Sequence, residues 1–113
     1  MSGLTTHVLD LTHGRPAAGV QVRLSKDGRL LATLETNRDG RSDGPILPAD
    51  AMTIGEYRLE FAIGPYFRAA GLDLPSPAFI ETAVVQFGIS DPGAHYHVPL
   101  LVSPFGYSTY RGS

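Results

Sequence analysis

The chain has 113 residues, of which 42% are hydrophobic and 18% charged, and its formal net charge is -2. This composition excludes disorder caused by low hydrophobicity and high charge, and the net charge gives no electrostatic case for a nucleic-acid partner. The absence of cysteine excludes disulfides and thiolate chemistry. No apolar run approaches the roughly 20 residues that cross a bilayer, and MSGLTTHVLD does not resemble a secretory signal. We therefore expect one cytoplasmic domain over 1–113 without a membrane partner.

Short segments of alternating polarity follow one another along the chain. They predict strands over residues 4–11, 20–24, 30–36, 55–63, 81–89 and 95–102. An Asp-Gly pair at 27–28 predicts a hairpin turn between the second and third of these strands. One short helix fits 65–72, with Pro65 in its first turn and Gly71 at its end, whereas two prolines keep 74–79 out of a central strand. Short strands with frequent turns predict an all-β fold, a β-sandwich.

Two histidines, His95 and His97, lie two apart in the last predicted strand and therefore share one face of it. The opposite face is the natural core side and carries Val98, Leu100 and Val102. Pro99 and Leu101 share the histidine face and make it too apolar for water, which indicates a covered face, most simply a subunit interface. A zinc site is an alternative for the His-x-His pair, but a third ligand is not evident from the sequence.

Two further side chains are open to more than one interpretation, and a third has a simple one. His7 lies in the first predicted strand, where both faces carry apolar residues, so its orientation stays ambiguous. Arg41 follows an Asp-Gly turn; it is either exposed to solvent or a fixed cation that binds a carbonyl, carboxylate or urea-like group. His13 lies in a turn, and we expect it to be solvated. The end of the chain is too aromatic for a free tail, because it carries Phe105, Tyr107 and Tyr110.

Three segments resemble the transthyretin-like family: HYHVPLLVSPFGYSTYRGS at the end, LTTHVLDLTHGRPAAGVQVRL near the start, and the loop TNRDGR. They are most similar to its enzyme branch, the 5-hydroxyisourate hydrolases of urate degradation. The terminal Tyr-Arg-Gly-Ser is the most specific element, since the hormone-carrier branch lacks it. The resemblance, from about Leu4 to Ser113, implies a β-sandwich of two sheets with one short helix. It also implies a homotetramer, a dimer of dimers with a channel between the dimers.

The resemblance also implies an active site and a reaction. The implied catalytic residues are His7, Arg41, His97 and Ser113, and the implied substrate-binding residues are Tyr110, Arg111, Gly112 and, in a supporting role, His95. The implied reaction opens the ring of 5-hydroxyisourate to give 2-oxo-4-hydroxy-4-carboxy-5-ureidoimidazoline. Neither a metal nor an organic cofactor is expected.

Each implied residue has an expected role in that reaction. His7 and His97 would hold and activate the water, and which of them is the general base stays open. Arg41, helped by Arg111, would bind the substrate ring and offset the charge of the oxyanion. Ser113 with its carboxylate would orient the substrate or a histidine.

Two other functions fit the same sandwich. The first is a small-molecule carrier of the transthyretin type that uses the channel between dimers; the two histidines and the terminal tetrapeptide argue against it, because an apolar ligand needs neither. The second is a plain interaction module, which predicts a monomer and assigns nothing to the tail. Turnover separates the hydrolase from both alternatives, and the oligomeric state separates the interaction module from the hydrolase and the carrier.

Overall fold

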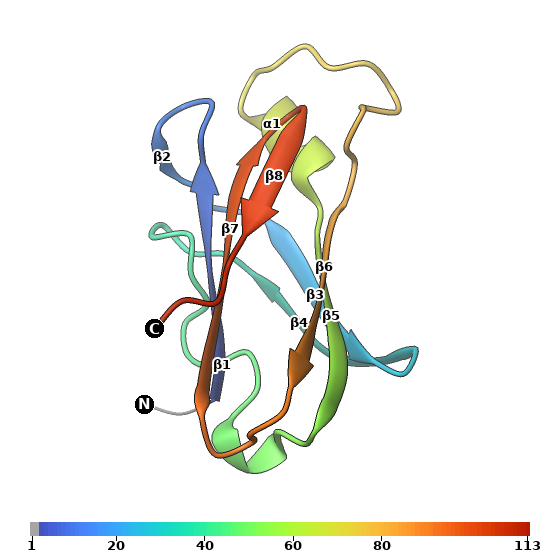
Figure 1. Cartoon of the computed structure of the whole chain (residues 1–113). Coiled ribbons are helices and arrows are strands. Elements are labelled where there is room, and N and C mark those ends of the chain that lie inside the picture. The colour runs from blue at the N-terminus through green and yellow to red at the C-terminus, as the bar shows by residue number, and fades with distance from the viewer. Residues whose placement is uncertain (1–2) are drawn as a thin grey trace.

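The computed structural model describes residues 3–113 and contains a sandwich of two four-stranded sheets (Figure 1). Its strands are β1 (Gly3–Asp10), β2 (Arg15–Pro16), β3 (Gln21–Lys26), β4 (Arg29–Glu35), β5 (Gly55–Phe61), β6 (Ala83–Ile89), β7 (His95–Ser103) and β8 (Gly106–Thr109). Its helices are the short α1 (Ile63–Ala69) and the single 3-10 turn η1 (Ala49–Ala51). One sheet has the order β2-β1-β7-β8 and the other β4-β3-β5-β6. Two sheets and one short α-helix confirm the predicted fold class.

The core lies between the two sheets and follows the alternation of the strands. The fully buried side chains include Val8 of β1, Val22 of β3, Leu59 and Phe61 of β5, and Leu100 of β7. Because successive strand residues point to opposite faces, the intervening residues of β1 and β7 lie on the outer face of their sheet. His7 lies on that outer face together with His95 and His97, which resolves the ambiguity over the first strand.

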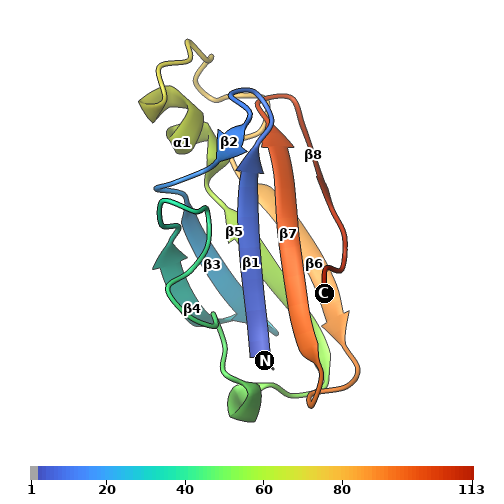
Figure 2. The same cartoon turned by 90° about the vertical axis from the view of Figure 1, so that its left-hand side faces the viewer.

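The first and seventh strands are adjacent and parallel, as Figure 2 shows. Their register places Thr5 opposite His97 and His7 opposite Pro99. Polar side chains from two distant segments therefore form one cluster on the outer face. Their positions depend on main-chain pairing, which fixes side chains more firmly than loops do.

The predicted elements differ from the observed ones mainly at their ends. The 27–28 hairpin turn is confirmed, with φ of 53° at Asp27 and 76° at Gly28, as a type I′ turn requires. The predicted strand 55–63 ends at Phe61, and α1 begins two residues earlier than expected, at Ile63. The pattern misled because Ile63 continues the alternation of buried residues although it is the first residue of the helix. Strands β2 and β8 were not predicted. Within residues 3–113, no helix is long and apolar enough to cross a membrane.

Candidate active site

A polar hollow of about 470 Å³ opens on the outer face of the sheet that contains β1 and β7. Its lining consists of Thr5, Thr6, Arg41, Ser42, Gly44, His95, His97 and Ser113. His7 lies beside it, because its backbone forms a β-bridge with Arg41. The structure thus brings together all four predicted catalytic residues, from β1, the loop 37–48, β7 and the tail.

A tight turn that begins at Asn37 positions Arg41. The Asn37 side-chain oxygen accepts a hydrogen bond from the Arg41 backbone N–H at 3.1 Å, and the Val8 N–H donates to the Gly40 carbonyl at 2.8 Å. Gly40 has φ of 75°, and a Cβ atom there would collide with the Val8 carbonyl oxygen, so glycine suits this approach to β1. Within residues 3–113 the Arg41 guanidinium forms no ion pair, which leaves it available to a ligand.

The ring of His97 is held from two sides. Its Nδ1 atom lies 2.8 Å from the Thr5 hydroxyl. On the other side, the Gly112 N–H donates to the His97 carbonyl at 2.8 Å, and a Cβ atom at Gly112 would lie 2.5 Å from His97 Cδ2. The end of the chain therefore lies against the outer face of β7 (Figures 1 and 2).

Burial and positive charge keep both site histidines neutral. Burial lowers the pKa of His7 below 6.5, and Arg41 lowers it further, while the backbone and charge of Asp39 oppose the shift. Burial also lowers the pKa of His97, followed by the effects of Arg41, His7 and His95. Both imidazoles are therefore uncharged at neutral pH, when each has one nitrogen lone pair and one N–H.

His95 stacks beside His97, with ring centroids 6.3 Å apart and 12° between the ring planes. Its Nε2 atom lies 3.4 Å from the Thr5 hydroxyl, while its buried Nδ1 atom has no hydrogen-bond partner. Within residues 3–113, no group of three or more His, Cys, Asp or Glu side chains is close enough together to hold a metal ion.

Two predicted binding residues, Tyr110 and Arg111, do not line this hollow. They line a separate hollow of about 250 Å³ between β6 and the tail. The Arg111 guanidinium carbon lies 4.1 Å from the centre of the Tyr96 ring, a cation–π contact. Its Nη2 donates to the His95 carbonyl at 3.2 Å. In a single chain Arg111 therefore binds the first residues of β7, and it does not line the hollow that contains Arg41.

His13 lies in an exposed turn, as predicted, but its side chain is only partly solvated because it also has partners in the protein. Its Nδ1 lies 2.6 Å from the carboxylate of Asp10, which is only 1% exposed. Its ring also stacks on Phe67, with centroids 6.4 Å apart. A buried carboxylate needs donors, and His13 is one of them, together with the hydroxyl of Tyr66.

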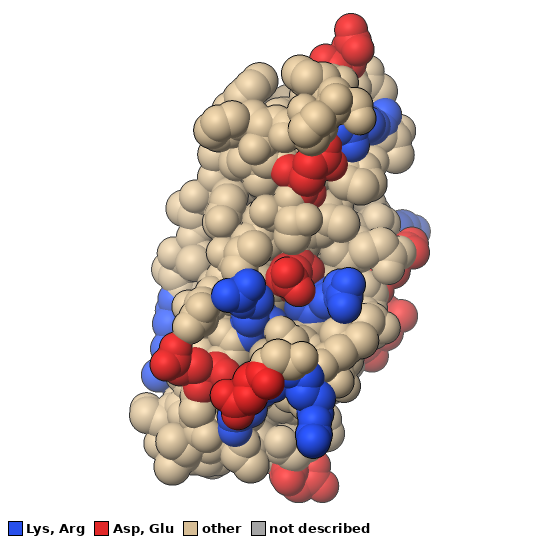
Figure 3. Space-filling model, turned by 90° about the vertical axis from the view of Figure 1, so that its right-hand side faces the viewer, with Lys and Arg blue, Asp and Glu red and all other residues tan. Residues whose placement is uncertain are grey.

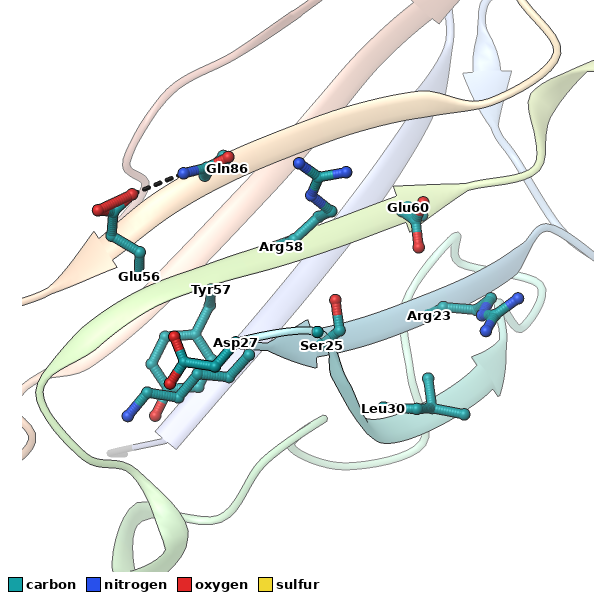
Figure 4. A pocket seen from close by; sticks show the side chains of 11 residues that line it. Arg23, Ser25, Asp27, Leu30, Glu56, Tyr57, Arg58, Glu60 and Gln86 are labelled. Carbon is teal, nitrogen blue, oxygen red and sulfur yellow. Dashed lines mark hydrogen bonds between the residues drawn. The ribbon is translucent and has the colours of Figure 1, made fainter.

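A second polar hollow, about 520 Å³ in volume, lies on the outer face of the other sheet. Figure 3 shows acidic and basic side chains interspersed on this face. The hollow contains three basic side chains (Arg23, Lys26, Arg58) and three acidic ones (Asp27, Glu56, Glu60). Figure 4 shows the close-up, in which Gln86 donates to Glu56 at 2.6 Å. Its acidic and basic side chains are equal in number, so it offers no excess positive charge for an anion, and it contains no histidine.

Comparison with known proteins agrees with the fold. A sandwich of two four-stranded sheets with one short helix places this chain among the transthyretin-like proteins. The chain belongs to the HIUase/Transthyretin family, whose model matches residues 4–112. It is 55% identical to 5-hydroxyisourate hydrolase 2 of Rhizobium meliloti (strain 1021), over 97% of this chain and 95% of that protein.

Two solved structures are similar over their whole length. The 5-hydroxyisourate hydrolase of Klebsiella pneumoniae is 41% identical, with a TM-score of 0.84 and complete coverage of both chains. The transthyretin of Sparus aurata is 29% identical, also with a TM-score of 0.84, over 99% of this chain and 97% of that one. The fold is thus common to proteins with both names, and the site has to distinguish between their functions.

The sequence analysis did not identify Thr5 as a site residue. Its signal is its parity with His7, two positions along the same strand. That parity indicates a site residue only when the parallel register of β1 and β7 is known, because this register places Thr5 opposite His97. Strand pairing between segments so distant in sequence cannot be deduced from a single chain.

Proposed function

We propose that this protein is a hydrolase that opens the ring of 5-hydroxyisourate in urate degradation. The product is 2-oxo-4-hydroxy-4-carboxy-5-ureidoimidazoline. The observation that carries the proposal is a cluster in which neutral His97 and unpaired Arg41 line one hollow and neutral His7 lies beside it. The names of the R. meliloti and K. pneumoniae relatives support the choice of substrate.

The reaction needs three contributions that these side chains can supply. A water molecule gives a proton to a neutral imidazole while its oxygen attacks a ring carbonyl. The negative charge that develops on the carbonyl oxygen is stabilised by Arg41. The ring C–N bond then breaks and the leaving nitrogen takes up a proton, so that water is divided between the new carboxyl group and the released N–H.

The tail would contribute to substrate binding. Ser113, which lines the hollow, would orient the substrate, and Gly112 would keep His97 in place. The proposed binding roles of Tyr110 and Arg111 depend on assembly, because in the single chain these residues line the separate hollow beside β6. His95 would support the ring of His97.

The carrier alternative finds less support in this chain. A carrier for an apolar ligand gains nothing from placing an arginine and two imidazoles in its binding site, because burying unpaired polar groups against an apolar ligand costs free energy. The hollow is instead lined mainly by polar side chains from four segments.

We also propose a homotetramer, a dimer of dimers, of single domains that each span residues 1–113. Partly exposed Leu9 and Leu101 lie opposite each other in the register of β1 and β7, on the face that carries the site. Nearby Leu11 is 57% exposed. An apolar surface of this kind is best covered by another copy of the chain. The cytoplasmic location stays a prediction.

The test is the ultraviolet absorbance decay of freshly generated 5-hydroxyisourate, which also decays spontaneously. Substoichiometric protein should accelerate the decay many-fold over this background. Replacing His97 with Asn should reduce kcat at least about 10²-fold, the usual contribution of a general acid or base.

Arg29→Ala serves as the control, because Arg29 is an exposed residue of β4 in the other sheet. It should retain full activity. Wild-type protein that is folded but leaves the decay rate unchanged would refute the hydrolase proposal and favour the carrier.

A further inference from the structure

One hydroxyl, that of Thr5, lies between two imidazoles. It is 2.8 Å from His97 Nδ1 and 3.4 Å from His95 Nε2. A threonine hydroxyl has one proton to donate and can accept two hydrogen bonds, while a neutral imidazole has its proton on only one nitrogen. The protonation of one ring is therefore coupled to that of the other through Thr5.

Three arrangements of the protons are possible. Thr5 can donate to His97 and accept from His95, donate to His95 and accept from His97, or accept from both rings. The second arrangement puts the His95 proton on Nδ1, which is buried and has no partner. Orphaned buried N–H groups are rare in proteins because they lose their hydrogen bond to water. This arrangement is therefore disfavoured.

The third arrangement is less favourable on two counts. Within residues 3–113, the Thr5 hydroxyl has no hydrogen-bonding neighbours other than these two rings, so its own proton would find no protein acceptor. The 2.8 Å contact to His97 lies towards the short end of the range of about 2.7–3.2 Å for N–H donors and at the commonest distance of O–H donors. The longer contact, to His95, suits a weak N–H donor.

We propose that Thr5 holds His97 in the tautomer whose proton is on Nε2. His97 then presents an N–H, not a lone pair, to the substrate, and the role of general base falls to His7. Thr5 is thus a positioning residue that acts through His97. This assignment rests on the proposed hydrolase function for its meaning, but the tautomer itself is a property of the free protein.

The resulting division of labour fits the reaction. His97 would donate its Nε2 proton in a hydrogen bond to the carbonyl oxygen or leaving nitrogen of the substrate. Among residues 3–113 no hydroxyl forms a hydrogen bond with the His7 ring, and His7 would accept the proton of the attacking water. Arg41 lies beside His7 through their backbone bridge and would stabilise the developing negative charge.

The test is long-range ¹H–¹⁵N correlation NMR of the free protein at about pH 8, where ordinary histidine is neutral. Protonated and bare ring nitrogens resonate in separate ranges, and replacing each of the four histidines in turn assigns the signals. We expect a protonated Nε2 and a bare Nδ1 for His97. A protonated Nδ1 would overturn the proposal.

Two variants test the hydroxyl itself. Thr5→Val keeps the shape of the side chain but removes the hydroxyl, and it should give a mixed His97 tautomer and about a 10-fold or greater loss of kcat, with KM nearly unchanged. Thr5→Ser should restore both the tautomer and the rate. Thr33→Val, at an exposed position of β4, is the matched control. An unchanged His97 tautomer in Thr5→Val would contradict the proposal. If that variant does not fold, the wild-type spectrum alone tests the tautomer.

The two proposals fail in different ways. A His97 proton on Nδ1 in a protein that accelerates 5-hydroxyisourate decay refutes the tautomer and leaves the function intact. A proton on Nε2 in a protein without turnover upholds the role of Thr5 and refutes the proposed function.

Discussion

At Gly112 the tail comes so close to His97 that a side chain would have no room. A Cβ atom there would lie 2.5 Å from Cδ2 and 3.3 Å from Cγ of the His97 ring. The imidazole is thus confined between this glycine and Thr5, and the backbone hydrogen bond from Gly112 closes the arrangement. A glycine is therefore required at position 112 because of its contact with His97, and not because a chain end is flexible.

Gly112→Ala should lower kcat/KM by about 10- to 100-fold, because a misplacement of about 1 Å in a catalytic group has an effect of this size. Steady-state kinetics measures this, and the melting temperature should stay close to that of the wild type, since the residue lies at the edge of the fold. Gly106→Ala is the control, because a Cβ atom at Gly106 in β8 would meet nothing within 4 Å. Full activity in Gly112→Ala would mean that the tail does not restrain His97.

At the scale of single elements, the end of β1 is tied to α1 by one buried carboxylate. Asp10 accepts hydrogen bonds from the backbone N–H groups of Thr12 and His13, from the His13 ring at 2.6 Å, and from the Tyr66 hydroxyl at 2.7 Å. Burial alone would raise the pKa of Asp10, but these hydrogen bonds outweigh burial and hold the pKa below 3.8. Burial, the hydrogen bond to Asp10 and the charge of Asp10 raise the pKa of Tyr66 to about 12, so Tyr66 remains a donor.

A carboxyl with a lower pKa in the folded than in the unfolded state stabilises the fold when it is ionised. The contribution of Asp10 is complete above 3.8 and is lost as the pH falls below that value, through the folded pKa. Asp10→Asn should lower the free energy of unfolding at neutral pH by about 2–3 kcal/mol and should lose less stability in acid than the wild type. Urea unfolding over a pH series measures both. A variant with the acid slope of the wild type would contradict this, and Asp73→Asn, at an exposed position, is the control.

Strands were predicted well from the sequence where buried and exposed residues alternate. They were predicted poorly where the strand depends on contacts with a neighbouring strand. Strands β3, β5, β6 and β7 follow from alternating apolar residues and agree with the structure to within two residues at each end. The short strand β8 has an exposed face and gives no such pattern. Its structure depends on pairing with β7, which places Tyr107 opposite Val102.

The site could be predicted only in part. Resemblance pointed to His7, Arg41 and His97, and the structure groups them. The role of Thr5 and the separate position of Arg111 depend on register and on the path of the tail. Both are three-dimensional properties that cannot be predicted from residue types and their spacing along one chain.

At the scale of the whole molecule, the site-bearing face remains partly apolar in a single chain. Leu9 and Leu101 are adjacent on it, whereas the outer face of the other sheet carries balanced charge. This asymmetry predicts which face associates. We expect sedimentation to give a species of about four times the chain mass of 12.1 kDa.

Leu101→Glu should shift this species to a smaller one, because it would bury an unpaired charge in the interface. Leu30→Glu is the matched control, since Leu30 is 49% exposed on β4 of the opposite sheet, and it should leave the assembly unchanged. A Leu101→Glu protein of wild-type mass would rule out this face as the contact, as would a monomeric wild type.

The parallel pairing of β1 with β7 also has a consequence in time. Thr5 and His97 are 92 positions apart, so the site has no local precursor and requires closure of nearly the whole chain. A partly folded chain that contains the β3–β4 hairpin, and with it much native secondary structure, would still be inactive without the pairing of β1 with β7. Recovery of turnover during refolding would therefore lag behind strand formation, because non-local pairings form last and slowly. The recovery of activity during refolding therefore reports when β1 has paired with β7.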